Sequence, residues 1–108
     1  MVKGKEYILD SIKETVAKVM PSNARVVLFG SQARGSAHED SDWDILILLN
    51  KSRIEHTDFD DVAYPLVELG WDIGAEINPI LYTYEDWQKR NFTPFYKNVI
   101  QDGIEIWH

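Results

Sequence analysis

A glycine-bounded polar segment between two apolar runs contains residues whose types and spacing could bind a metal ion. The segment runs from Gly30 to Asp44 and reads GSQARGSAHEDSDWD. Asp42 and Asp44 are separated by one residue, so in an extended strand both carboxylates point to the same face, about 7 Å apart. Two such carboxylates repel each other unless a cation lies between them, and Mg²⁺ is commonly held by one or two carboxylates together with substrate phosphates. This spacing predicts a magnesium site.

The beginning of the same segment has the residues that an anion site needs. Gly30 and Gly35 allow backbone conformations that other residues resist, and Gly30 lets the main chain approach a ligand closely. Backbone N–H groups, the Ser31 hydroxyl and the Arg34 guanidinium could then bind phosphate oxygens. Residues 31–34 are expected to form a helical turn, which Ser31 could also cap. A turn with solvated aspartates is the simpler alternative.

The complete pattern resembles a known family. Gly30-Ser31, ten intervening residues and Asp42-Trp43-Asp44 are similar to the Gly-Ser…Asp-x-Asp signature of the DNA polymerase beta-type nucleotidyltransferase superfamily. The fuller form, Gly-Ser-x-Ala-Arg-Gly…Ser-Asp-x-Asp, is similar to its minimal nucleotidyltransferase branch. The resemblance implies an α/β (α+β) fold of the polymerase beta-like type, with a small mixed sheet flanked by helices.

The resemblance also implies the reaction and the ligands. ATP would be the substrate, with its triphosphate along Gly30, Ser31 and Arg34, and Asp42 and Asp44 would bind one of two Mg²⁺ ions. The family takes a third carboxylate from the strand beside the Asp-x-Asp strand. Glu76 is the candidate for it, although Asp is more frequent in the family; Asp72 is the competitor, but its place before Gly74 is more typical of a turn.

The resemblance further implies a protein partner. Many minimal nucleotidyltransferases are antitoxins that attach AMP to a tyrosine of a helical HEPN-domain ribonuclease toxin. Two alternatives stay open, a degenerate antitoxin that acts by binding alone and an enzyme that modifies small molecules such as aminoglycosides. Neither homo-oligomers nor hetero-oligomers are excluded.

Composition narrows the classes of function. The 108 residues are expected to form one domain, 1–108, and 44% of them are hydrophobic. A formal net charge of −7 argues against direct nucleic-acid binding, which depends on many Lys and Arg side chains. The sequence has no cysteine, no signal peptide and no membrane-length apolar run, a combination compatible with the cytoplasm. Zinc-like spacing is absent among His38, His56 and His108.

Hydrophobic periodicity predicts the elements that hold the segment in place. The motif joins two strands, and the second should place Trp43, Ile45, Ile47 and Leu49 on one face and Leu46 and Leu48 on the face of the aspartates. One helix should be capped by Thr57 or Asp58 and end at Gly70, and Pro65 should kink or divide it. Pro79 predicts an edge strand or a bulge. The predicted helices cover residues 5–20, 57–69, 84–90 and 94–102, and the predicted strands cover residues 24–29, 42–49, 74–83 and 104–107.

Overall fold

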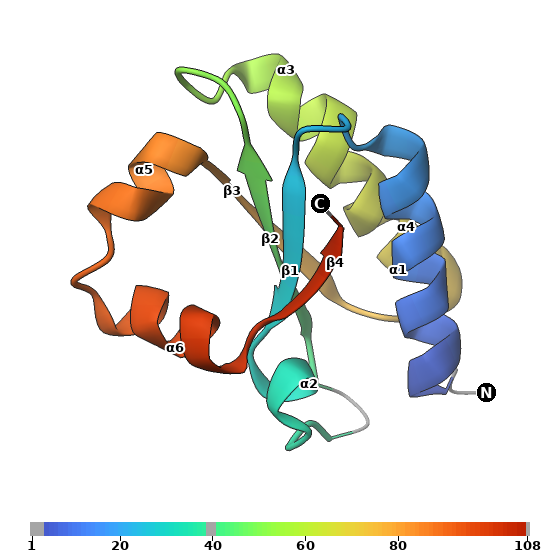
Figure 1. Cartoon of the computed structure of the whole chain (residues 1–108). Helices are drawn as coiled ribbons and strands as arrows, with labels where there is room; N and C mark the ends of the chain where they lie inside the picture. The colour runs from blue at the N-terminus through green and yellow to red at the C-terminus, as the bar shows by residue number, and fades with distance from the viewer. Residues whose placement is uncertain (1–3, 39–40, 108) are drawn as a thin grey trace.

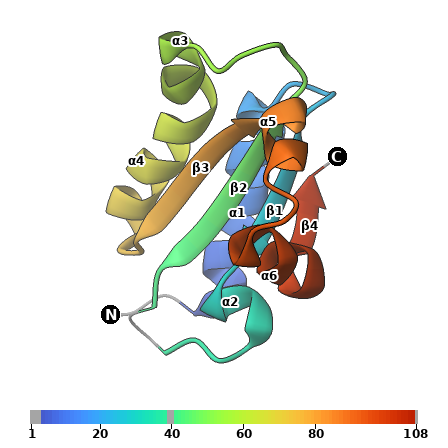
Figure 2. The same ribbon diagram turned by 90° about the vertical axis from the view of Figure 1, so that its left-hand side faces the viewer.

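A mixed β-sheet forms the centre of the computed structural model, which describes residues 4–38 and 41–107. Within these residues the sheet has four strands in the order β3-β2-β1-β4, with helices on both faces (Figures 1 and 2). β2 pairs parallel with β3, whereas β1 pairs antiparallel with both β2 and β4. The predicted mixed sheet is therefore confirmed. The strands are β1 (Arg25–Phe29), β2 (Trp43–Leu49), β3 (Ile77–Thr83) and β4 (Ile104–Trp107).

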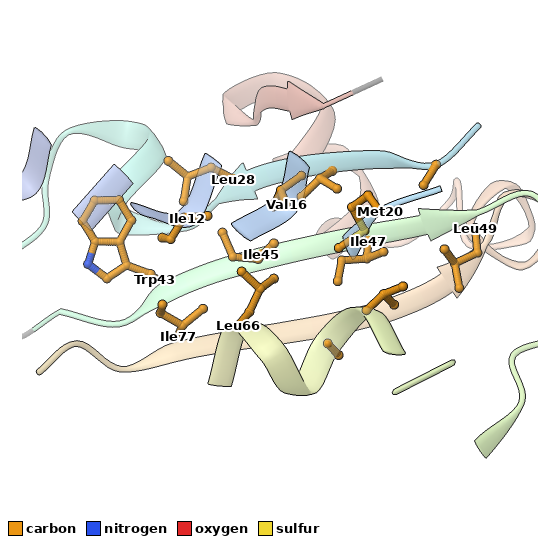
Figure 3. Close-up of a cluster of buried hydrophobic side chains, with 14 of the residues drawn as sticks. Ile12, Val16, Met20, Leu28, Trp43, Ile45, Ile47, Leu49, Leu66 and Ile77 are labelled. Carbon is orange, nitrogen blue, oxygen red and sulfur yellow. The ribbon is translucent and has the colours of Figure 1, made fainter. Parts of the chain in front are cut away.

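One face of the sheet is covered by α1 (Lys5–Val19) and α4 (Tyr64–Ile73). Ile12 and Val16 of α1 and Leu66 of α4 pack against Ile45 and Ile47 of β2, and all five side chains are buried (Figure 3). The hydrophobic effect of this burial holds β2 rigidly. No helix in the described part of the chain is long and apolar enough to cross a membrane.

The opposite face is covered by α5 (Tyr84–Lys89) and α6 (Pro94–Asp102). Trp87 is buried there, with its ring 5.6 Å from that of Phe95 and 4.7 Å from that of Tyr96 between centroids. Leu46 and Leu48 of β2 belong to the same cluster. Tyr82, Tyr84, Phe95 and Tyr96 also pack against this cluster, whereas Phe92 is 75% exposed.

β2 alternates between these two clusters as the sequence predicts. Trp43, Ile45, Ile47 and Leu49 lie in the α1/α4 cluster, and Leu46 and Leu48 lie in the α5/α6 cluster. Side chains two residues apart in a strand share a face, so Asp44 lies on the face of Leu46 and Leu48. It is the second residue of β2 and is only half-buried.

The helical stretch after β2 differs from the prediction at both ends. It begins with α3 (His56–Asp58), and its N-cap is Glu55, which forms a capping box with Asp58; the predicted caps Thr57 and Asp58 are wrong. Gly70 does not end α4, which continues to Ile73 and stops at Gly74, where φ is 74°. Gly74 adopts the left-handed conformation that commonly ends a helix, whereas Gly70 does not.

Pro65 and Pro79 have the predicted effects. A π-helical segment, η1 (Phe59–Ala63), separates α3 from α4 directly before Pro65, which lies in the first turn of α4. Proline is tolerated in a first turn because its missing N–H group would have no partner inside the helix there. Pro79 lies in β3, an edge strand of the sheet.

Candidate active site

The predicted site residues come together at one end of the sheet. The end of β1, the start of β2 and the start of β3 meet there, next to the short helix α2 (Ser31–Arg34) (Figures 1 and 2). Strand register places Asp44 opposite Phe29 of β1 on one side and opposite Asn78 of β3 on the other. Gly30, the next residue after Phe29, is therefore a close neighbour of Asp44.

Gly30 touches the Asp44 carboxylate with its backbone. Its φ of 77° lies in the region that favours glycine, and a Cβ atom added there would collide with the carboxylate oxygen Oδ2 of Asp44. Gly30 is also the N-cap of α2 and accepts hydrogen bonds from the N–H groups of Ala33 and Arg34, both 3.1 Å. Ser31 is the first residue of α2 and not its cap, so that part of the prediction is wrong.

Asp44 lies in an environment that disfavours its charge. Partial burial, followed by the nearby charge of Asp42, raises the pKa of Asp44. Hydrogen bonding to Asn78 and the charge of Arg34 lower it, but they do not compensate. A carboxylate pushed toward its neutral form by a second carboxylate would be relieved by a bound cation.

Asp42 connects the start of β2 to the start of β3. The Asn78 amide donates a hydrogen bond to Oδ2 of Asp42, 3.1 Å away, and the Trp43 N–H donates to the Glu76 carbonyl oxygen at 2.8 Å. The Glu76 side chain shares a hydrogen bond with Asp42, which raises the pKa of Glu76. The Glu76 and Asp42 side chains are therefore neighbours.

The structure brings Asp42 together with Asp44 and with Glu76, in two overlapping pairs. Among residues 4–38 and 41–107, no group of three or more acidic or histidine side chains has the arrangement of a metal site. Glu76 as the third carboxylate stays a prediction. Asp72 is exposed in the last turn of α4, not in a turn as predicted. His108 lies outside the described residues.

The donors present fit Mg²⁺. Asp42, directly before β2, and Asp44, its second residue, supply hard carboxylate oxygens, and the charge of Asp42 raises the pKa of Asp44. Mg²⁺ needs only one or two protein carboxylates when phosphates and water complete its coordination. Arg34, whose charge reaches Asp44 from α2, could pair with phosphates beside them.

Sequence reasoning missed Asn78 as a site residue. Its amide touches Asp42 and influences Asp44, so it lies between the two aspartates on the neighbouring strand. The signal that could have found it is the parallel pairing of β2 with β3, which places Asn78 opposite Asp44.

Comparison with known proteins shows the family of the chain. Residues 8–105 match the family model described as a nucleotidyltransferase domain. The chain belongs to this family. A relative at 37% identity over 79 residues, 73% of each chain, is a provisionally named protein adenylyltransferase of Methanocaldococcus jannaschii.

Two solved structures have a similar fold to this nucleotidyltransferase domain. A provisionally named nucleotidyltransferase of Sulfolobus solfataricus has a TM-score of 0.58 at 26% identity, covering 99% of this chain and 91% of the other. A toxin–antitoxin structure with AMP-PNP has a TM-score of 0.60 at 19% identity, covering 91% of this chain and 71% of the other. The latter likeness concerns the fold alone. The predicted resemblance of the chain to nucleotidyltransferases is confirmed by the family match and by the adenylyltransferase relative.

Proposed function

We propose that this nucleotidyltransferase transfers AMP from ATP to a tyrosine hydroxyl of a partner protein, a HEPN-domain ribonuclease toxin, in a Mg²⁺-dependent reaction. The observation that carries the proposal is the contact of Gly30 with the Asp44 carboxylate beside Asp42 and Arg34. That contact joins an anion-binding turn to a pair of acidic side chains, which is the combination that a metal-bound triphosphate requires. The adenylyltransferase name of the 37%-identical relative supports AMP as the transferred group.

Each site residue has a distinct role in this proposal. Gly30, Ser31 and Arg34 bind the triphosphate, and Arg34 offsets its negative charge. Asp42 and Asp44 would hold the magnesium ion of the nucleotide, and both, with Glu76, a second ion. Bound magnesium ions in such a pair would make the acceptor hydroxyl more acidic and stabilise the charge on the entering and leaving oxygens.

The reaction is an in-line displacement at the α-phosphorus. The acceptor oxygen forms a bond to the α-phosphorus, and the bond from that phosphorus to the oxygen bridging to the β-phosphorus breaks. Pyrophosphate leaves with the electron pair. The hydroxyl proton passes to a carboxylate of the acidic group and then to water.

The toxin–antitoxin neighbour and the family resemblance support the proposed partner. That neighbour was solved with AMP-PNP, a nucleotide of the kind proposed here. The proposed setting is the cytoplasm, where ATP and such a partner occur together.

Intact-mass measurement of the partner tests the proposal. The protein encoded beside this chain is incubated with the chain, ATP and Mg²⁺, and we expect its mass to increase by one or more AMP groups. A stable complex without a mass increase would favour the binding-only antitoxin. Transfer to an aminoglycoside but to no protein would favour the small-molecule enzyme.

A further inference from the structure

A pocket of 390 Å³ lies between α4 and the start of β3, and we call it the α4 pocket. Its apolar lining includes Val67 and Trp71 of α4 and Ile77 of β3. β3 is an edge strand, and Figure 2 shows α4 beside it at one edge of the molecule. Trp71 and Gly74, which also line the pocket, are exposed, so the pocket opens at the surface.

An aromatic pair lies along the outer side of α4 next to this pocket. Trp71 is 68% exposed and Tyr64 is 39% exposed, and their rings meet edge to face with centroids 5.9 Å apart. Residues seven apart in a helix lie on the same side of it. The contact with Tyr64 holds the Trp71 ring in place, which reduces the entropy lost when a partner covers it. Exposed tryptophans beside an apolar pocket are typical of protein-binding surfaces.

The surroundings of the pocket are acidic. Two exposed carboxylates of α4, Glu68 and Asp72, are each the next residue after one that lines the pocket. Residues 54–88 contain nine of the chain's 18 Asp and Glu residues and none of its 11 Lys and Arg residues. Among the described residues, no ion pair includes Glu68 or Asp72. This charge favours a basic partner and repels nucleic acid and anionic lipid surfaces.

The walls of the pocket favour a helical occupant over an extended one. The pocket runs between a helix and a strand, and the apolar row of an amphipathic helix inserts into grooves of this kind. An extended segment would instead pair with the free edge of β3. Pro79 lies in that strand and has no N–H group to offer to an added strand.

We propose that the α4 pocket binds an amphipathic helix of a partner protein that carries Lys or Arg side chains beside an apolar anchor. The anchor fills the pocket and contacts Trp71, and the basic side chains pair with Glu68 and Asp72. Apolar burial supplies the affinity, and the charges select a basic partner. The inference goes beyond the proposed function and does not depend on it, because α4 covers one face of the sheet and Asp44 lies on the other.

Titration of a designed peptide tests the pocket. An amphipathic helical peptide of leucine and lysine is added to the isotope-labelled chain without nucleotide, and NMR follows the backbone amides and the tryptophan indoles. We expect saturable shifts at Trp71 and along α4, and unchanged indole signals of the buried Trp43 and Trp87. The same peptide with glutamate in place of lysine should bind at least about tenfold more weakly. Absence of saturable shifts along α4, or equal binding of the glutamate peptide, would overturn the proposal.

Substitutions with matched controls localise the binding. Trp71→Ala and Glu68→Lys should each raise the Kd of the lysine peptide about tenfold, the first through lost apolar contact and the second through repulsion. Phe92→Ala removes a ring that is 75% exposed and does not line the pocket. Glu85→Lys makes the same charge change on α5, at the opposite face of the sheet. Both controls should keep the wild-type Kd, and thermal melts verify that all four variants are folded.

Other results would overturn the inference in recognisable ways. Trp71 signals that shift when the chain alone is diluted would show that a second copy covers the pocket. Equal losses of affinity in Glu68→Lys and Glu85→Lys would show attraction to the net charge and not to this surface. Peptide binding at α4 without AMP transfer by the wild type would support the inference and contradict the proposed function. AMP transfer without peptide binding would overturn the inference alone.

Discussion

Gly30 and Asp44 depend on each other. The carboxylate of Asp44 occupies the space that any side chain at position 30 would need, and the backbone of Gly30 has a φ of 77°. Two separate physical reasons, a collision and backbone strain, therefore favour glycine there. Gly35 has the same kind of backbone, with φ 78°, but no atom lies within 4 Å of a Cβ built on it.

Gly30→Ala and Gly35→Ala separate those two reasons. Both variants carry backbone strain of about 1 to 2 kcal/mol, but only Gly30→Ala pushes Asp44 out of position. We expect AMP transfer to fall about 100-fold in Gly30→Ala, the usual effect of a displacement near 1 Å, and to change little in Gly35→Ala. Steady-state kinetics and thermal melts of both proteins provide the check. Equal activity losses in the two variants would show that strain alone matters.

The raised pKa of Asp44 predicts a pH dependence of stability in the metal-free protein. Because the folded pKa lies above 3.8, the folded state binds the proton more readily than the unfolded chain. The free energy of unfolding therefore falls as pH rises from about 3.8 through the folded pKa. Asp44→Asn should remove this loss of stability, because the amide does not ionise.

Thermal melts in EDTA across this range measure the effect. We expect the Tm of Asp44→Asn to exceed that of the wild type at about pH 7 and the difference to vanish below about pH 3.8. A wild-type protein that is as stable as Asp44→Asn at neutral pH, or more stable, would contradict the assigned environment of Asp44.

At the scale of elements, α4 is held close to the start of β3 by a glycine inside the helix. A Cβ at Gly70 would lie 2.5 Å from the carbonyl oxygen of Ala75. Gly70 is buried and belongs to the wall of the pocket next to Glu76 and Asn78. The close approach of α4 therefore sets where the start of β3 lies relative to Asp42.

Gly70→Ala should destabilise the fold and reduce activity together. The collision with a backbone carbonyl outweighs the roughly 1 kcal/mol that alanine gains over glycine in a helix, so we expect a net loss of about 1 to 2 kcal/mol. Urea denaturation measures this loss in the free energy of unfolding. Glu68→Ala, at an exposed position of the same helix, is the control and should leave the free energy of unfolding nearly unchanged. A Gly70→Ala protein as stable as this control would mean that α4 can move away from β3.

The sequence was informative where the signal is local. The alternation along β2 placed its two faces correctly, and Thr83 caps α5 through a 3.0 Å bond from the Asp86 N–H group, as a Thr followed three residues later by Asp indicates. Gly70 and Gly74 could not be ranked as helix ends, because the difference depends on the packing of Gly70 against Ala75. Asn78 was missed for the same reason, since its role depends on the pairing of two strands far apart in the sequence.

At the scale of the whole molecule, ligand binding should be visible as stability. A ligand that binds only the folded state raises the free energy of unfolding, by about 2.7 kcal/mol at 100 times its Kd. We expect ATP with Mg²⁺ to raise the Tm of the wild type by several degrees and ATP with EDTA to raise it much less. Asp42→Asn and Asp44→Asn should lose the part of the Tm increase that depends on magnesium. The same rise in all three proteins would place the nucleotide elsewhere.

The central claim is that Asp42 and Asp44, at the start of β2, serve nucleotidyl transfer. The most direct test is the rate at which label passes from α-³²P-labelled ATP to the partner protein, measured for the wild type and for Asp44→Asn at equal Mg²⁺. Asn has nearly the shape of Asp, so the fold should persist, which a thermal melt verifies. The account predicts labelling by the wild type and a rate at least about 100-fold lower in the variant. Full labelling by a folded Asp44→Asn protein would contradict it.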